Sequence, residues 1–317
     1  MSLRAHILVA VVLTLLPAEG SGDVILVDHA GHGDYLTIRE GVEAASSGDT
    51  VRVAPGTYVG ESNRGITLDG ITLASEGGPE DTTVDCDGLD YAFQVIGSSV
   101  LDGFTVTNAR GSTINGYAAI YSSYSVISNC MLTGNPGAGL LTYGENCITG
   151  CGFLSNGGSG ARLERTSGVI SGCLFDASGL SIVDEWYGGY RELGVLDCIF
   201  SGVGGAALAV YHESPLIQRC LFVDNDYALH LNNSFAEIRD CTIASNHSSS
   251  NGAMHFTLDG HSGLSNGCIV ENCIVAFNSC VGSVAGAPDE STFDQNCLFG
   301  NAGGDSLASR SSTRSNL

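Results

Sequence analysis

Lysine is absent from this chain: its 12 basic residues other than histidine are all arginines, against 34 aspartates and glutamates. The formal net charge is −22 at pH 7. Because proteins neutralise nucleic-acid phosphates with a basic surface, this composition argues against nucleic acid as a partner. The same charge repels acidic polymers at low salt unless Ca²⁺ bridges them, although physiological salt screens the repulsion beyond roughly 8 Å.

Proline is also scarce, with 6 residues against 44 glycines, which favours short strands joined by tight turns over long helices. The one long apolar run, at residues 7–16, follows Arg4 and precedes the small residues Ala18 and Gly20. This is the pattern of a secretory signal, here residues 1–20, and the run is too short to span a bilayer. We therefore expect a protein without a membrane span, secreted or at the cell surface.

Cysteine, by contrast, is abundant, and eight of the 12 cysteines begin one repeated phrase. A large apolar residue follows each of these cysteines by two positions, and an asparagine usually follows by five. The eight are Cys130, Cys151, Cys173, Cys198, Cys220, Cys241, Cys273 and Cys297. Their intervals run from 21 to 32 residues and most lie near 22, the signature of a solenoid. Since a repeat array is one unit however long it is, we expect one elongated domain.

The phrase also predicts local structure. The residue three positions before the cysteine is Ile or Val except in the last phrase, where it is Asp294. The residue just before the cysteine is Asn, Asp or Gly except at Arg219. These types tolerate a left-handed backbone, so a corner is expected there. A further strand follows the cysteine strand in each coil, as at residues 228–231 and 253–256. The second and fourth positions of this further strand are apolar.

Three strands per coil of about 22 residues predict an all-β fold, a right-handed parallel β-helix solenoid of roughly ten coils. We assign residues 21–65 to an N-terminal cap with a short helix at 34–45, residues 66–305 to the β-helix, and residues 306–317 to a disordered tail. A cap is needed because the open end of a solenoid exposes core side chains and unpaired strand edges.

Stacked coils place the phrase cysteines in an inward column of small apolar side chains, a cysteine ladder. Adjacent Cα atoms are within disulfide reach, but parallel Cα–Cβ bonds make the torsion poor. We therefore favour buried free thiols over disulfides, and zinc less because paired close cysteines are missing. Four cysteines out of register are expected to pair or to be exposed: Cys86, Cys147, Cys268 and Cys280.

Residues 34–58, together with the coils, resemble the secreted right-handed β-helix superfamily of pectate lyases, pectin esterases and polygalacturonases. The resemblance covers nearly the whole chain after the signal and implies a polysaccharide lying along one flat strand face. It implies no particular reaction. Gly31-His32-Gly33 matches a polygalacturonase element but precedes the helix, and Asp197, which matches an esterase segment, is a corner residue of the repeat. The lack of lysine excludes lysine-dependent lyases.

Outward positions of the further strand hold the catalytic candidates His230, His255, Tyr211 and Arg162. Stacking at one coil spacing brings His230 near His255 and Tyr211. A histidine or tyrosine with a pKa near neutrality could take a sugar-ring proton, and an arginine could stabilise the resulting charge. The alternative is that a solvated strand face simply carries polar residues.

Substrate-binding candidates lie in and beside the lengthened coils: Trp186, Tyr187, Asp184, His212, Glu213 and Glu164. Trp186 is the only tryptophan, and aromatic rings on projecting loops stack well on sugars. The alternative is that these rings cover their own loop.

No cofactor is expected, although carboxylates on adjacent coils leave Ca²⁺ as an alternative. The candidate calcium ligands are Asp224, Asp226, Asp184, Glu185, Glu213 and Asp259. The sequence thus predicts a monomeric secreted β-helix protein that binds extracellular or cell-wall polysaccharide. Two alternatives stay open: a non-enzymatic surface or adhesion scaffold, and a polysaccharide lyase or glycoside hydrolase acting on the outer face of one sheet.

Overall fold

The computed structural model describes residues 22–112, 116–184, 192–257, 267–286 and 290–305. The predicted signal at 1–20 and the predicted tail at 306–317 lie outside these ranges. The chain is an all-β parallel β-solenoid of about 11 turns, about 23 residues apart, and only 4% of it is helical. The predicted fold class is therefore confirmed, with one more coil than expected.

The described residues form two units, where the sequence predicted one. The first holds residues up to Arg162 together with Thr166–Val169, and the second holds Leu163–Arg165 and residues from Ile170 onward. The strand β14 (Ala161–Ser171) contributes residues to both.

The first unit begins with β1 (Val24–Val27), which pairs in parallel with β2 (Thr50–Val53). Between them lies α2 (Ile38–Ala44), shorter than the predicted helix because Thr37 caps its N-terminus. The Thr37 hydroxyl and the Glu40 carboxylate form a capping box, which satisfies backbone N–H groups that the first helical turn leaves unpaired. Because β2 also pairs with β5 (Thr72–Ser75), the strands of the predicted cap continue directly into the coils.

The other elements of the first unit are β3 (Gly56–Val59), η1 (Glu61–Asn63), β4 (Ile66–Asp69), β6 (Thr82–Asp85), β7 (Phe93–Ile96), β8 (Val100–Asp102), β9 (Thr105–Thr107), β10 (Ala118–Ser128), β11 (Met131–Thr133), β12 (Ala138–Thr149) and β13 (Gly152–Leu154). One ladder runs β3, β6, β9, β11, β13, and another runs β4, β7, β10, β12. Leu141 of β12 is buried at 5% exposure. It contacts the segment at Gly116, where an added Cβ would lie 2.6 Å from Leu141 Cδ2.

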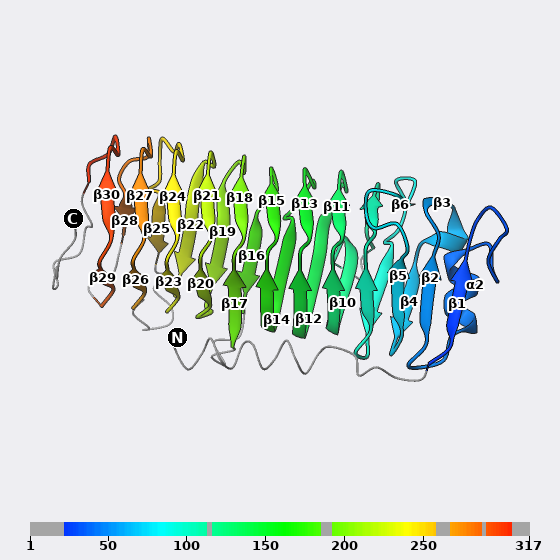
Figure 1. The fold of residues 1–317 in the computed structure, drawn as a ribbon. Coiled ribbons are helices and arrows are strands. Elements are labelled where there is room, and N and C mark those ends of the chain that lie inside the picture. The colour runs from blue at the N-terminus through cyan, green and yellow to red at the C-terminus, as the bar shows by residue number, and fades with distance from the viewer. Residues whose placement is uncertain (1–21, 113–115, 185–191, 258–266, 287–289, 306–317) are drawn as a thin grey trace. The chain divides into compact units, whose positions relative to one another are not determined.

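The second unit contains β15 (Leu174–Asp176), β16 (Leu180–Val183), β17 (Leu193–Leu196), β18 (Ile199–Ser201), β19 (Ala206–Tyr211), β20 (Leu216–Gln218), β21 (Leu221–Val223), β22 (Tyr227–Asn232), β23 (Glu237–Arg239), β24 (Thr242–Ala244), β25 (Met254–Thr257), β26 (Ile269–Glu271), β27 (Ile274–Ala276), β28 (Val284–Ala285), β29 (Thr292–Asp294) and β30 (Cys297–Phe299). Three parallel ladders follow: β16, β19, β22, β25, β28; then β17, β20, β23, β26, β29; and β15, β18, β21, β24, β27, β30 (Figure 1). Each coil therefore supplies three strands, as predicted.

The predicted corner is present before the cysteines. Asn129, Asp197 and Asp240 have φ angles of 50°, 56° and 55°. Arg219, the exception by residue type, adopts the same left-handed conformation with φ 54°. Its guanidinium donates to both carboxylate oxygens of Asp197 in the preceding coil, at 2.6 and 2.7 Å. Such a bidentate pair holds the side chain in one orientation on an exposed corner.

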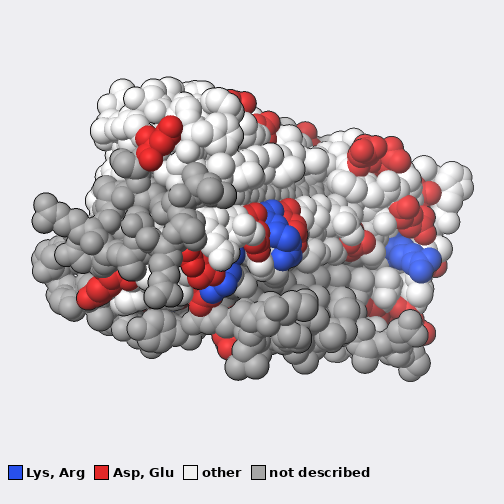
Figure 2. Space-filling view, turned by 60° about the vertical axis from the view of Figure 1, so that its left-hand side comes forward, with Lys and Arg blue, Asp and Glu red and all other residues white. Residues whose placement is uncertain are grey.

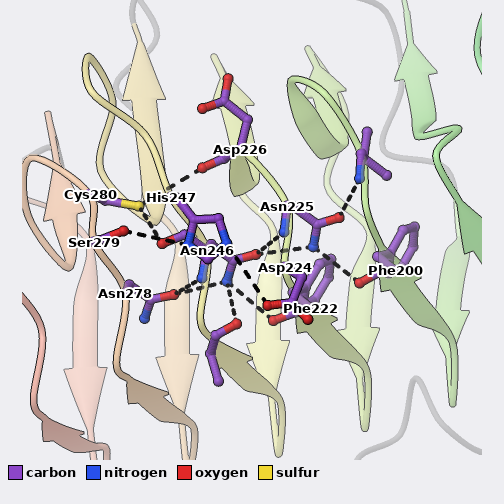
Figure 3. A network of polar contacts seen from close by, with 12 residues as sticks. Phe200, Phe222, Asp224, Asn225, Asp226, Asn246, His247, Asn278, Ser279 and Cys280 are labelled. Atoms are coloured by element: carbon purple, nitrogen blue, oxygen red, sulfur yellow. Dashed lines mark hydrogen bonds and ion pairs between the residues drawn. The ribbon is translucent and has the colours of Figure 1, made fainter.

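Inward side chains stack from coil to coil. The rings of Phe175, Phe200 and Phe222 lie parallel, with centroids 4.7 Å apart in each pair. The asparagines after the cysteines do more than mark a turn, because they form a buried chain of hydrogen bonds (Figure 3). Asn246 Nδ2 donates to Asn278 Oδ1 at 2.9 Å, and its own Oδ1 accepts from the Asn225 amide at 3.0 Å.

The last phrase is displaced by one residue from its predicted register. The left-handed corner is Gln295, with φ 53°, and Asn296 lies inward at 1% exposure where a cysteine was expected. Its Oδ1 accepts from the Cys273 backbone N–H at 2.9 Å. Cys297 therefore pairs with Ile274 on the outward side of β30 and is exposed.

Inside the second unit, the thiols of Cys198, Cys220 and Cys241 interact from coil to coil. Hydrogen bonding to the cysteine of the preceding coil, followed by burial, raises the pKa of each. Each sulfur also lies near a carbonyl of the preceding coil, as for Cys220 and Val195 O at 3.4 Å. The prediction for the cysteines out of register was wrong, because all four are buried free thiols that fill core space: Cys86, Cys147, Cys268 and Cys280.

Candidate functional site

Two histidines lie side by side on the outward face of β19, β22 and β25. Strand register pairs Ala209 with His230 and His230 with His255. Leu229 and Leu231 are fully buried on either side of His230, so alternation directs the imidazole outward. The two histidines are therefore one coil apart, which was the geometric condition for the predicted cluster.

Polar contacts join three strands at this point. His230 Nδ1 lies 3.4 Å from the Tyr211 hydroxyl, and His230 Nε2 lies 3.0 Å from Thr257 Oγ1. Asn232 Nδ2 donates to the same Thr257 hydroxyl at 2.9 Å. His230 is thus held from β19 on one side and β25 on the other.

Aromatic rings surround these contacts. The His230 and His255 rings are 5.5 Å apart, and Tyr211 meets His230 edge to face at 5.4 Å. Tyr227 lies against both histidines, with centroid distances of 6.4 Å to His230 and 6.3 Å to His255. We call Tyr211, Tyr227, His230, Asn232, His255 and Thr257 the histidine face.

Tyr227 is the member that sequence reasoning missed. It precedes the alternating part of its strand, so the expected outward positions did not include it. The signal was a size difference: Tyr227 pairs with Ala206, and Gly252 stands at the corresponding place of the next coil. A large ring among small neighbours was the clue.

The environment keeps both histidines neutral near pH 7. Burial lowers the pKa of His230, and repulsion from His255 lowers it further. Burial also lowers the pKa of His255. The Tyr227 pKa is raised by burial and by the nearby Tyr211 and Asp226. A neutral imidazole beside a phenol can accept or relay a proton, which is the chemistry expected of a general base.

The membership of Arg162 in the predicted cluster stays a prediction. Arg162 lies in the first unit, whereas the histidine face lies in the second. Glu164, a predicted substrate-binding residue, is a half-buried residue of β14 in the second unit.

The remaining substrate-binding candidates follow β16 and β19 in the sequence. Trp186 and Tyr187 fall outside the described residues. Asp184 and Glu213 are each buried at 2% exposure, and their role in substrate binding stays a prediction. His212, which is half-buried with φ 60°, has Nδ1 3.0 Å from the Asp184 carbonyl oxygen.

Within the described ranges, no three His, Cys, Asp or Glu side chains converge as metal ligands. Of the six candidate calcium ligands, Glu185 and Asp259 lie outside those ranges, so calcium binding stays a prediction. In the same part of the chain, no helix is both long and apolar enough to cross a bilayer.

Neither a protein-family profile nor a curated protein matches the sequence. Among solved structures, the chain is similar to the A-module of the mannuronan C-5 epimerase AlgE6 of Azotobacter vinelandii. The TM-score is 0.59 at 15% identity, over 86% of this chain and 91% of that one.

A second similar structure is the catalytic unit of a GH87 α-1,3-glucanase from Streptomyces thermodiastaticus, with a TM-score of 0.56 at 15% identity over 84% of this chain. This chain spans 60% of the length of that structure. At identities this low, the structural similarity establishes a shared fold and nothing more. The fold is thus the right-handed parallel β-helix, as predicted.

Proposed function

We propose that this is a secreted β-helix protein that binds extracellular polysaccharide on the histidine face. The observation that carries the proposal is the convergence of four rings on one flat sheet: Tyr211, Tyr227, His230 and His255. Aromatic rings stack on the apolar faces of sugars, and the amide and hydroxyl groups beside them can bond sugar hydroxyls. The similar folds support the proposal, because a mannuronan epimerase and an α-1,3-glucanase both act on polysaccharides.

Binding of the chain from residue 21 onward to a panel of neutral and uronate polysaccharides tests this proposal. His230→Ala should weaken binding at least about fivefold, because it removes a stacking ring and the contacts that align Tyr211 and Thr257. His247→Ala is the matched control. His247 is an exposed histidine after β24, with Nδ1 3.4 Å from Ser279 Oγ (Figure 3). Equal affinity of the two variants for every bound polymer would contradict the proposal, and absence of all binding would favour a surface scaffold.

A second candidate function is proton abstraction from a sugar ring, as in a polysaccharide lyase. The 3.4 Å contact between Tyr211 and neutral His230 favours it, because a hydroxyl held against an imidazole can exchange a proton with substrate. Unsaturated products that absorb in the ultraviolet and disappear in Tyr211→Phe would support a lyase. New reducing ends without unsaturation would favour a hydrolase, and binding without any product would contradict both.

A further inference from the structure

The histidine face contains no formally charged side chain at neutral pH. Its six members are two tyrosines, two histidines, an asparagine and a threonine. The groups facing His230 are Tyr211 from β19, His255 and Thr257 from β25, and Tyr227 from its own strand. None of them supplies a positive charge while the histidines are neutral.

Two other described arginines of the second unit are engaged by carboxylates. Arg219 is held by Asp197, and Arg239 contacts Glu271 at 2.6 Å and Glu237 at 3.3 Å. Figure 2 shows arginine side chains lying directly against acidic ones. By composition, residues 185–191 contain one acidic and one basic residue, Glu185 and Arg191, and residues 258–266 contain Asp259 and His261.

Hydrogen bonding favours the same neutral state. Because Asn232 donates to Thr257 Oγ1, the Thr257 hydroxyl proton can point at His230 Nε2. His230 then carries its own proton on Nδ1, toward the Tyr211 oxygen. Protonation of Nε2 would reverse the Thr257 hydrogen bond and place a cation beside His255. This agrees with the lowered pKa of both imidazoles.

Resting on the proposed function, we propose that the histidine face selects uncharged glycans at neutral pH and admits polyuronates only on acidification. A carboxylate that enters this half-buried face loses water and gains no counter-charge, whereas a neutral sugar ring keeps its stacking and hydroxyl contacts. The net charge of −22 adds repulsion of anionic polymers, although at about 0.15 M salt it acts only within roughly 8 Å. In acid the two histidines become cations, while uronates stay ionised above about pH 4.

The test compares galacturonan and mannuronan with the same polymers after carboxyl reduction, so that each pair differs only at C6, where a neutral hydroxymethyl group replaces the carboxylate. Affinity is measured near pH 7.5 and near pH 5 at about 0.15 M salt. Near pH 7.5 the reduced polymer should bind at least about tenfold more tightly than its anionic parent. Near pH 5 this ratio of affinities should be smaller by a factor of at least about three.

Two variants separate this selectivity from general damage. His255→Gln should keep the neutral preference and lose part of the pH response, because one titrating ring is gone. His247→Gln should match the unmodified chain. If the anionic parents bind as tightly as the reduced polymers near pH 7.5, or if the preference does not change with pH, the charge selection is wrong and the proposed function survives. If no polymer binds at either pH, the proposed function itself fails.

Discussion

At the residue scale, His230 and His255 make the second unit sensitive to acid. Their pKa values in the folded chain lie below the ordinary value of 6.5. As the pH falls below that value, the unfolded chain takes up protons that the folded chain does not yet bind. The two neutral histidines therefore contribute stability that is fully present above about pH 6.5. This contribution is lost as the pH falls through their lowered pKa values in the folded chain.

We expect the free energy of unfolding to decrease from about pH 7 to about pH 5 and His230→Gln to reduce that decrease. Denaturant titrations at several pH values measure how the free energy of unfolding changes with pH. Proton NMR of the imidazole C–H groups measures the pKa values of His230 and His255 directly. His247→Gln is the control. A His230 pKa at or above 6.5 would contradict the burial argument.

At the element scale, the turns between strands are joined by the buried asparagine chain. Asn246 Nδ2 also donates to the Phe222 carbonyl oxygen at 3.2 Å, and Asn246 Oδ1 accepts from the Asn225 backbone N–H at 3.1 Å. The row of hydrogen-bonded asparagines ends at Asn301. There the Asp305 carboxylate accepts hydrogen bonds from the Asn301 backbone and side-chain N–H groups, at 2.9 and 2.8 Å. Asp305 thus takes the place of the next asparagine at the last described coil.

Asn246→Ala should lower the free energy of unfolding by about 3 kcal/mol, because it leaves the Asn225 amide and the Phe222 carbonyl buried without their partner. Asn272→Gly is the matched control at an exposed corner with φ 54°, where glycine is tolerated. It should change stability by no more than about 0.5 kcal/mol. Urea unfolding compares the two variants, and equal losses would show that the asparagine chain adds nothing specific.

At the scale of the whole molecule, the 12 cysteines are all free, and Cys297 alone is exposed. Burial raises the pKa of Cys86 and of Cys268 to about 12, so few thiolates form there at neutral pH. Because the thiolate is the reactive form, burial and raised pKa both suppress alkylation.

Iodoacetamide should modify one thiol in the folded chain and all 12 after denaturation. Intact mass spectrometry counts the additions, and peptide mapping should place the native one at Cys297. Cys297→Ser should remove native labelling without affecting the denatured count of the other thiols. Rapid modification of a buried cysteine such as Cys220, or a disulfide in the native mass, would contradict this arrangement.

Much of the fold followed from local patterns. The corner before the first seven repeat cysteines, the inward Phe200 and Phe222, and the outward His230 all obey alternation interrupted by a left-handed residue. The last coil was misread because Asn296, another small side chain that satisfies buried backbone groups, replaces cysteine there. Sequence alone did not distinguish the two adjacent residues.

The site was less accessible to sequence reasoning. Register placed His230 beside His255, but nothing in the spacing indicated that Tyr227 joins them or that Asp184 and Glu213 are buried. The repeat by itself determined the coil, its corners and its inward rows, because each depends on residues a few positions apart and on stacking at one spacing. Only the tertiary structure decided which outward side chains meet and which carboxylates are covered, since those contacts depend on side-chain packing between coils that no single coil encodes.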